Sequence, residues 1–342
     1  MLFYIIILFL VLISTKSFDI KKVSNGFGYC LASFILILVA ILRFDVGWDY
    51  QSYYTILDEE IKAGYIRFEP LSLLISFIAM YFNMPSIFFI LSGLIMYVTA
   101  FYAFKRFSVS PSISLIVYVG LFYLISLSII RQALAISVCI YAYRYVISHN
   151  FKKYFICIIV ATLFHYSAII SLIVYPIFHR FKIKTVILYI ILAVFTRTII
   201  LYLLEYFNVF SAYLEKIDDI EGGKFTRVFY LLILISFFLL VKRKTYNEYE
   251  RKHISIILVG LACPFLFGAM GERVGYYFLI YYCYLIPLLV HKKTIEKRII
   301  YVMIFSLYFI STIYITSNIE EQKSAYTPYR TIFTADKYSF KY

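Results

Sequence analysis

Apolar runs follow one another along almost the whole chain, with short polar segments between them. The long apolar runs lie at residues 2–13, 27–42, 86–104, 111–130, 132–147, 185–204, 226–241, 254–270, 274–290 and 299–316. Most of them come close to the ~20 residues that a helix needs to cross the hydrocarbon core of a bilayer. No polar block is long enough for a separate soluble domain. The pattern predicts an all-α polytopic membrane protein in which residues 1–342 form a single domain.

Two further apolar segments are ambiguous. Residues 70–82 are too short for a comfortable span, and residues 154–178 are interrupted near His165. If each segment crosses once, the basic pairs at 105–106 and 152–153 fall outside, against the positive-inside rule. If both are re-entrant or half-helix hairpins, every basic cluster falls inside. We therefore predict about ten full spans plus two re-entrant pieces, or 10–12 transmembrane helices in all.

Composition supports the membrane assignment. Hydrophobic residues make up 63% of the chain, charged residues 15%, and the mean hydropathy is +0.85. These values exclude an ordinary soluble domain and make a lipid bilayer the expected surroundings. The net charge of +14 comes from basic clusters between the spans, so we expect no nucleic-acid partner. The five cysteines lie in apolar runs without CxxC spacing, which indicates packing residues and neither disulfides nor a metal site.

The first run, residues 2–13, has no basic segment before it and no small-residue cleavage site after it. We interpret it as an uncleaved first span whose N-terminus lies outside.

The most unusual polar stretch, residues 43–50, directly follows the apolar run at 27–42. It places Arg43, Asp45 and Asp49 at the end of a hydrophobic segment. Charges there are costly unless they face water, lipid headgroups or a polar ligand. An interfacial belt does not explain two carboxylates one helical turn apart beside an arginine. We interpret the stretch as part of a functional site.

The same stretch is rich in aromatic residues. Trp48 is the only tryptophan of the chain, and Tyr50 and Tyr53 follow it closely. These side chains alone are typical of the aromatic belt at a membrane interface. Within a site, they are also candidates to stack on sugar rings. Both interpretations remain open at this stage.

Three further polar groups fall on the same side of the membrane in the predicted topology. They are Arg131 with Gln132, His165 with its neighbours, and Arg273. Taken singly, each is explained as a helix-end anchor, a cap or a structural ion pair. Together with Arg43 they offer three guanidinium groups, whose planar donors match phosphate oxygens.

A hydroxyl nucleophile near these arginines would need a base. The candidates are Asp45, Asp49 and His165, and the sequence does not distinguish among them. No acidic cluster has metal-ligand spacing, so we expect arginines in place of a divalent cation, and no cofactor. The sequence also carries no credible zinc-protease, nucleophile-elbow or phosphate-loop motif. These parts together indicate chemistry on a lipid-linked, phosphate-bearing substrate.

Residues 43–50 resemble the R-x-D-V-G-x-D-Y stretch of the EpsG family, a branch of the Wzy-type O-antigen and capsular polysaccharide polymerases. Further resemblances follow in order along the chain: Arg131-Gln132-Ala133-Leu134-Ala135, His165-Tyr166-Ser167-Ala168, Glu272-Arg273 with Tyr276-Tyr277, and a weaker Tyr326-Thr327-Pro328-Tyr329. Together these motifs cover most of the chain.

The resemblance implies a metal-independent glycosyltransferase with a GT-C-like fold in the bacterial inner membrane. Its active site would face the periplasm or exterior. Such a polymerase takes undecaprenyl-pyrophosphate-linked repeat units of O-antigen, capsule or exopolysaccharide. It transfers the growing chain to a hydroxyl of the next unit, with release of undecaprenyl pyrophosphate. A chain-length regulator and a flippase are the implied protein partners.

The resemblance also suggests roles for individual residues. Arg131 and Arg273 would stabilise the departing pyrophosphate, with Arg43 assisting. Gln132 would join the aromatic residues in binding sugar. Three rival functions remain: an O-antigen ligase, a flippase or other transporter, and a membrane acyltransferase with His165 as its base. Modest external loops argue against a ligase, the lack of an internal repeat argues against a transporter, and the arginine set argues against an acyltransferase.

Overall fold

The computed structural model describes residues 1–15, 26–60, 63, 68–206, 246–291, 295–317 and 325–333. Nearly all of these residues form helices, and one pair of two-residue strands joins two distant parts of the chain. The predicted all-α polytopic class is confirmed. The apolar run predicted at 226–241 lies outside the described residues.

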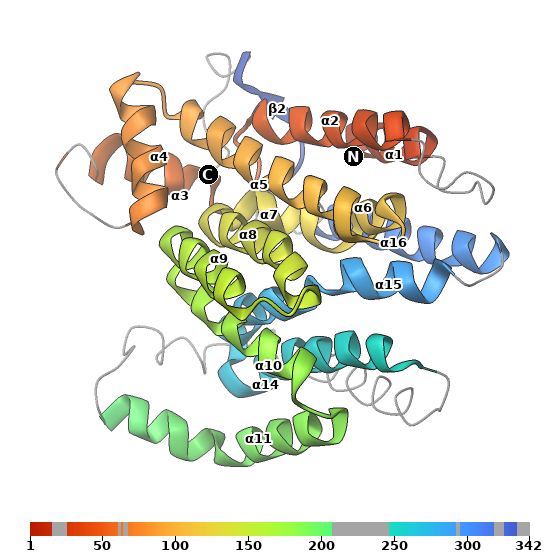
Figure 1. Cartoon of the computed structure of the whole chain (residues 1–342). Helices are drawn as coiled ribbons and strands as arrows, with labels where there is room; N and C mark the ends of the chain where they lie inside the picture. The colour runs from red at the N-terminus through yellow and green to blue at the C-terminus, as the bar shows by residue number, and fades with distance from the viewer. Residues whose placement is uncertain are drawn as a thin grey trace.

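The first half of the chain forms a group of roughly parallel helices, which run across the view in Figure 1. They are α1 (Leu2–Thr15), α2 (Gly26–Ile41), α5 (Ser86–Phe107), α6 (Pro111–Tyr118), α7 (Leu124–Ser128) and α8 (Ile130–Ile147). A π-helical turn, Val119–Tyr123, joins α6 to α7. Pro111 opens α6, where the missing N–H of proline leaves no hydrogen bond unmade.

The segment predicted at 154–178 forms a hairpin and not one continuous helix. Helix α9 (Phe151–Phe164) ends at His165, and a 3₁₀ helix (Tyr166–Ile173) leads into α10 (Val174–His179). The imidazole Nε2 of His179 lies 2.8 Å from the carbonyl oxygen of Val146, near the start of α9. The end of α10 therefore lies close to the start of α9, which is the arrangement of a re-entrant hairpin.

The segment predicted at 70–82 forms α4 (Pro70–Tyr81), whose twelve residues extend only about 18 Å, less than the thickness of a bilayer core. In Figure 1, α4 runs across the direction of α1, α2 and α5, beside the short α3 (Tyr50–Thr55) and the π-helical turn Ile56–Glu60. Asn83 adopts a left-handed conformation, with φ of 51°, and turns the chain from α4 into α5.

The later helices are α11 (Ile183–Tyr206), α14 (Glu248–Leu279), α15 (Tyr282–His291) and α16 (Ile295–Ser317). Helix α14 folds back on itself. A Cβ on Gly275 would lie 2.8 Å from the carbonyl oxygen of Gly260. In a straight helix these residues would be about 22 Å apart. Pro264 lies between them. The first limb holds most of the run predicted at 254–270, and the run predicted at 274–290 begins in the second limb and continues into α15.

Among the described residues, few helices have full membrane length. By length and composition, three helices of the described chain could span a bilayer, at Ser86–Phe107, Pro111–Ser128 and Arg298–Ser317, or up to four with a pair bent by 42°. Five other apolar helices, α1, α2 and α4 among them, are shorter. Helix α8 has 18 residues, but Arg131 and Arg144 reduce its apolar character.

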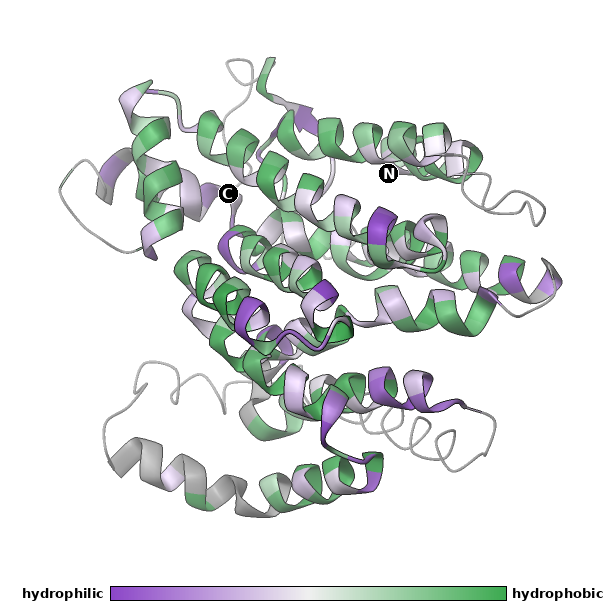
Figure 2. Cartoon of the chain, in the orientation of Figure 1, coloured by the Kyte–Doolittle hydropathy of each residue, from purple (hydrophilic) through white to green (hydrophobic). Residues whose placement is uncertain are grey.

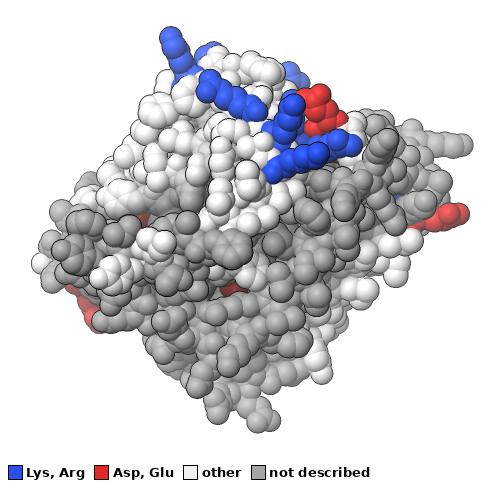
Figure 3. Space-filling view, turned by 90° about the horizontal axis from the view of Figure 1, so that it is seen from below, with Lys and Arg blue, Asp and Glu red and all other residues white. Residues whose placement is uncertain are grey.

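The basic side chains gather at one end of the helix group, here called the basic end. Its described members are Lys105, Arg106, Arg144, Lys152, Lys153, Arg180, Lys182, Lys184, Arg251, Lys252 and Arg298. The Arg144 guanidinium lies 5.6 Å from the Phe107 ring centroid, which joins the ends of α5 and α8. Figure 3 shows several Lys and Arg side chains close together on one part of the molecule.

The helices between the two ends are mostly apolar, as the green ribbons of Figure 2 show. Large hydrophobic side chains lie exposed along several of them, including Phe9, Phe155 and Leu307. An apolar surface of this kind is expected where lipid replaces water. The opposite end, here called the site end, is formed by the starts of α5 and α8 and by the ends of α2, α7 and α9.

Candidate active site

The loop at residues 43–49, here called the motif loop, is held in an unusual conformation at the site end. Its first two residues form β1 (Arg43–Phe44), which pairs antiparallel with β2 (Arg330–Thr331) near the C-terminus. Gly47 has φ of 114°, and a Cβ at this position would lie 2.5 Å from the carbonyl oxygen of Leu127. Only glycine allows this backbone and this close approach to α7.

Two charged residues of the motif loop are buried and bind other parts of the fold. Arg43 is 1% exposed, and its guanidinium donates to the carbonyl oxygens of Ala40, at 2.9 Å, and Leu127, at 3.1 Å. Asp45 is also 1% exposed, and its Oδ2 lies 3.3 Å from a guanidinium nitrogen of Arg330. Arg43 therefore connects α2 to α7, and Asp45 anchors the C-terminal segment.

The three aromatic candidates differ in their surroundings. Tyr50 is fully buried and stacks on Phe89, with ring centroids 4.0 Å apart. Tyr53 is buried as well. Trp48 is partly exposed, and its backbone N–H donates to the Ser128 hydroxyl at 3.0 Å. Of the three, Trp48 is the one that keeps part of its surface exposed.

Asp49 ends the motif loop and immediately precedes α3. Burial raises the pKa of this carboxyl above its usual range, while the positive charges of Arg273 and Arg131 act in the opposite direction. Asp49 is thus within electrostatic range of both arginines, unlike Asp45, which is paired with Arg330.

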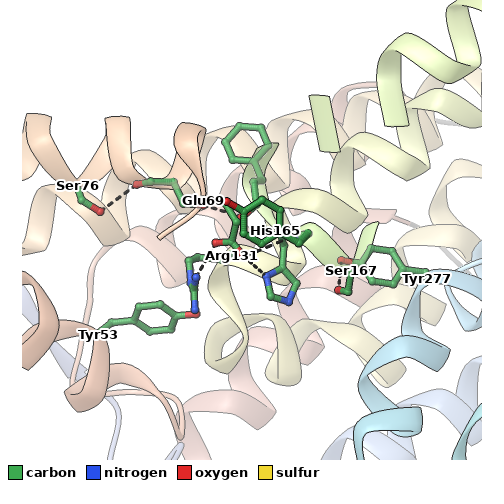
Figure 4. Close-up of polar contacts among 10 residues, drawn as sticks. Tyr53, Glu69, Ser76, Arg131, His165, Ser167 and Tyr277 are labelled. Carbon is green, nitrogen blue, oxygen red and sulfur yellow. Dashed lines mark hydrogen bonds and ion pairs between the residues drawn. The ribbon is translucent and has the colours of Figure 1, made fainter. Parts of the chain in front are cut away.

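Glu69 lies at the centre of the polar cluster at the site end (Figure 4). Its Oε2 accepts a hydrogen bond from the Arg131 guanidinium at 2.6 Å, and its Oε1 lies 2.7 Å from Nδ1 of His165. The backbone N–H of Tyr166 also points to Oε1, at 3.4 Å. Three segments far apart in the sequence therefore meet at one carboxylate. We call Glu69, Arg131 and His165 the Glu69 cluster.

Local structure explains why these residues meet. Glu69 directly precedes Pro70, the first residue of α4, and a carboxylate is favoured at a helix N-terminus. Arg131 is the second residue of α8, and His165 occupies the break between α9 and the 3₁₀ helix. The Ser72 hydroxyl donates to the carbonyl oxygen of Phe164 at 2.9 Å, which holds α4 against the end of α9.

The charge state of Glu69 follows from these contacts. Burial alone would raise the pKa of Glu69, since its side chain is 4% exposed. The hydrogen bond from His165 and the charge of Arg131 outweigh burial, and together they hold the pKa below its usual range. Glu69 is therefore ionised at neutral pH and acts only as a hydrogen-bond acceptor.

An ionised Glu69 determines the tautomer of His165. Because the carboxylate can only accept, Nδ1 of His165 must carry the hydrogen of the 2.7 Å contact. Nε2 of neutral His165 then has a lone pair available for a proton. The His165 side chain is 28% exposed. This pairing is the arrangement by which a carboxylate orients a histidine base.

Arg131 and Arg273 lie at the border of this cluster. Nε of Arg131 contacts the Tyr53 hydroxyl at 3.5 Å, and its guanidinium lies 4.5 Å from the Phe68 ring centroid. The Arg131 side chain remains 21% exposed. The amide of Gln132 donates to the backbone carbonyl of Arg273 at 2.5 Å, which places the limb of α14 beside α8. Arg273 itself is exposed.

The structure thus separates the predicted site residues into two groups. It brings together Asp49, Tyr53, Arg131, Gln132, His165 and Arg273. It places Arg43, Asp45 and Tyr50 in buried, structural positions. Their predicted roles in catalysis, in pyrophosphate binding and in sugar binding stay predictions.

Sequence reasoning missed Glu69 as a site residue. The available signal was a glutamate directly before a proline that opens a short apolar segment. No group of three His, Cys, Asp or Glu side chains within the described ranges is arranged to hold a metal ion.

Comparisons with known proteins give one match. The EpsG family model matches residues 27–331, which is nearly the whole chain. No curated protein and no solved structure matches the chain. The GT-C-like architecture therefore stays a prediction.

Proposed function

Because the chain belongs to the EpsG family of Wzy-like polymerases, we propose that it joins undecaprenyl-pyrophosphate-linked oligosaccharide repeat units into a surface polysaccharide. The growing chain leaves its lipid carrier and is transferred to a hydroxyl of the next unit. The observation that carries this proposal is the Glu69 cluster, which pairs an oriented histidine with a partly exposed arginine.

The position of the cluster supports an outward-facing site. It lies at the end of the helix group opposite the basic end. Following the positive-inside rule, the basic end faces the cytoplasm and the site end faces the periplasm or exterior of the inner membrane. A flippase that delivers the lipid-linked units to that face, and a chain-length regulator, are the partners we expect.

His165 is the base that this geometry favours. Its Nε2 takes the proton from the acceptor hydroxyl as the oxygen forms its bond to the anomeric carbon of the donor. The bond between that carbon and the pyrophosphate oxygen breaks, and its electron pair leaves with undecaprenyl pyrophosphate. Ionised Glu69 holds the imidazole in the required tautomer and stabilises it once protonated.

Two arginines are available for the charge on the leaving group. Arg131 keeps part of its guanidinium exposed although Glu69 and Tyr53 bind two of its nitrogens. Arg273 is exposed beside it. A planar guanidinium donates to two phosphate oxygens at once, which stabilises the developing charge. Asp49, near both arginines, is the second candidate base, and Trp48 is the candidate sugar platform.

The test is a gel profile of surface polysaccharide from a strain that lacks the gene, with and without a plasmid copy. We expect loss of the long-chain ladder to a single-repeat band, restored by the wild-type plasmid. An unchanged ladder would contradict the proposal. Loss of all surface glycan, the single-repeat band included, would instead indicate a flippase or a ligase.

A matched pair of variants connects this test to the site. Glu69→Gln removes the charge that orients His165 but keeps the size of the side chain, so the plasmid should no longer restore the ladder. Glu248→Gln is the control, since Glu248 is largely exposed and pairs with Lys252 at the basic end. It should restore the ladder fully.

A further inference from the structure

The segment at residues 325–332, here called the C-terminal strap, lies against the motif loop. The backbone N–H of Gly47 donates to the carbonyl oxygen of Ala325 at 2.8 Å. At the other end of the strap, the N–H of Ile332 donates to the carbonyl oxygen of Leu42 at 2.9 Å. Between them β2 pairs with β1. The strap therefore contacts the motif loop along most of its length.

Side chains add to these backbone contacts. Arg330 of the strap forms the ion pair with buried Asp45. The Tyr4 hydroxyl of α1 donates to the carbonyl oxygen of Tyr326 at 2.9 Å. The Tyr329 ring stacks on Phe3, with ring centroids 4.1 Å apart. The strap is thus fixed to α1 on one side and to the motif loop on the other.

The motif loop needs such support because of its own backbone. Asp45 has φ of 51°, a left-handed conformation that non-glycine residues rarely adopt. A conformation of this kind persists only when the surrounding contacts determine it. The strand pairing before Asp45, the ion pair of Asp45 with Arg330 and the hydrogen bond from Gly47 after it supply those contacts.

The motif loop leads directly to the residues that face the candidate site. Asp49 is its last residue, and Tyr53 lies on the next helical turn. Tyr53 contacts Nε of Arg131, and Asp49 lies within electrostatic range of the same guanidinium. A displacement of Asp45 would therefore move the groups that position Arg131.

We propose that the C-terminal strap is a positioning element of the site and that Arg330 is its positioning residue. Arg330 acts through Asp45 and the motif loop and does not touch the substrate. Through these contacts Arg330 keeps Asp49 and Tyr53 close to Arg131. This inference rests on the proposed function for its effect on turnover, but the contact between strap and motif loop is testable without any activity.

Trp48, the only tryptophan of the chain, reports on the motif loop directly. In the purified full-length protein in detergent, Arg330→Gln should shift the Trp48 emission to longer wavelength and increase its quenching by iodide. Ile332→Pro, which removes one backbone donor without changing charge, should act in the same direction. Arg330→Lys keeps the charge and should preserve the wild-type spectrum.

Arg298→Gln is the matched control. Its guanidinium also binds neighbouring groups, the carbonyl oxygens of Val290 and His291, but at the basic end. It should leave Trp48 unchanged. Unchanged emission and quenching in both Arg330→Gln and Ile332→Pro would overturn the proposal, whether or not the protein proves to be a polymerase.

Turnover with lipid-linked repeat units tests the positioning role. Arg330→Gln and Asp45→Asn should each lower kcat roughly 10- to 100-fold with little change in KM, since misplacement of a catalytic group has effects of this size. The double variant should lose no more than either single variant, because both remove one interaction. Arg330→Lys should restore most of the rate.

Additive losses, or a wild-type rate in Arg330→Gln, would contradict the positioning role. If the protein is not a polymerase, the experiments give a different combination of results. The ladder would then be unchanged in the deletion strain, while the Trp48 spectra would still respond to the strap variants.

Discussion

Two arginine–carboxylate groups lie at the site end, and they differ in what they face. In the motif loop, Arg43 and Asp45 are each 1% exposed and bind backbone carbonyls or the C-terminal strap. In the Glu69 cluster, the carboxylate is buried, but Arg131 and His165 remain 21% and 28% exposed. The group that is more conspicuous in the sequence is buried within the fold. The group assembled from three separate segments keeps two side chains partly exposed.

The sharpest test of this contrast is removal of the imidazole. His165→Gln should lower polymerisation roughly 10²- to 10⁴-fold, the usual contribution of a general base. His291→Gln, at the exposed end of α15, is the matched control and should retain activity. Turnover of lipid-linked repeat units by the purified protein measures both. Full activity in His165→Gln would leave Asp49 as the base.

The next effect is expected at Arg131. Arg131→Lys keeps the positive charge but loses the planar donors, so turnover should fall roughly 10- to 100-fold. Arg144→Lys makes the same change on the same helix, at the basic end, and should have little effect. If the two variants behaved alike, recognition of the pyrophosphate by paired donors at Arg131 would be wrong.

Arg43, which joins α2 to α7, should respond in stability and not in chemistry. Arg43→Met removes a buried guanidinium and leaves the carbonyls of Ala40 and Leu127 without their donor. We expect a loss of about 2 kcal/mol or more in stability, since each unsatisfied buried group has a cost of this order. The melting temperature should fall while turnover per folded molecule is largely kept. A wild-type melting temperature with lost turnover would instead place Arg43 in the chemistry.

The smallest expected effect is on the way the melting temperature depends on pH. The pKa of Glu69 is lowered by its partners, so its contribution to stability is present above the ordinary glutamate pKa and is lost as the pH falls through the lowered value. The melting temperature of the wild-type protein should therefore exceed that of Glu69→Gln at neutral pH. The difference should shrink on acidification below about pH 4. A difference that grows in acid would contradict an ionised Glu69.

Much of the fold follows from the sequence, because hydrophobic runs and basic clusters obey simple rules in a membrane. The hairpin around His165 was predicted from charge alone, since only a return of the chain keeps 152–153 with the other basic pairs. The fold-back of α14 was not predicted in this form. Contact between Gly260 and Gly275 depends on packing that no local pattern records.

The site was predictable in part. His165, Arg131 and Arg273 interrupt apolar runs, and such interruptions are visible in one sequence. Glu69 precedes a helix start and looks like an ordinary loop acid. The partner of Asp45, Arg330, lies 285 residues further along the chain, so nothing near the motif loop indicates that Asp45 is already paired.

That separation also has a consequence for how the protein is made. Strand β1 emerges early from the ribosome, whereas β2 emerges only after every intervening helix has been synthesised. The N-terminal part of a chain folds first during synthesis. Here the motif loop can pair only after β2 has been synthesised. A ribosome that stops early therefore leaves behind a membrane-inserted fragment whose motif loop is unpaired. The motif loop therefore reaches its paired form only once β2 has been synthesised.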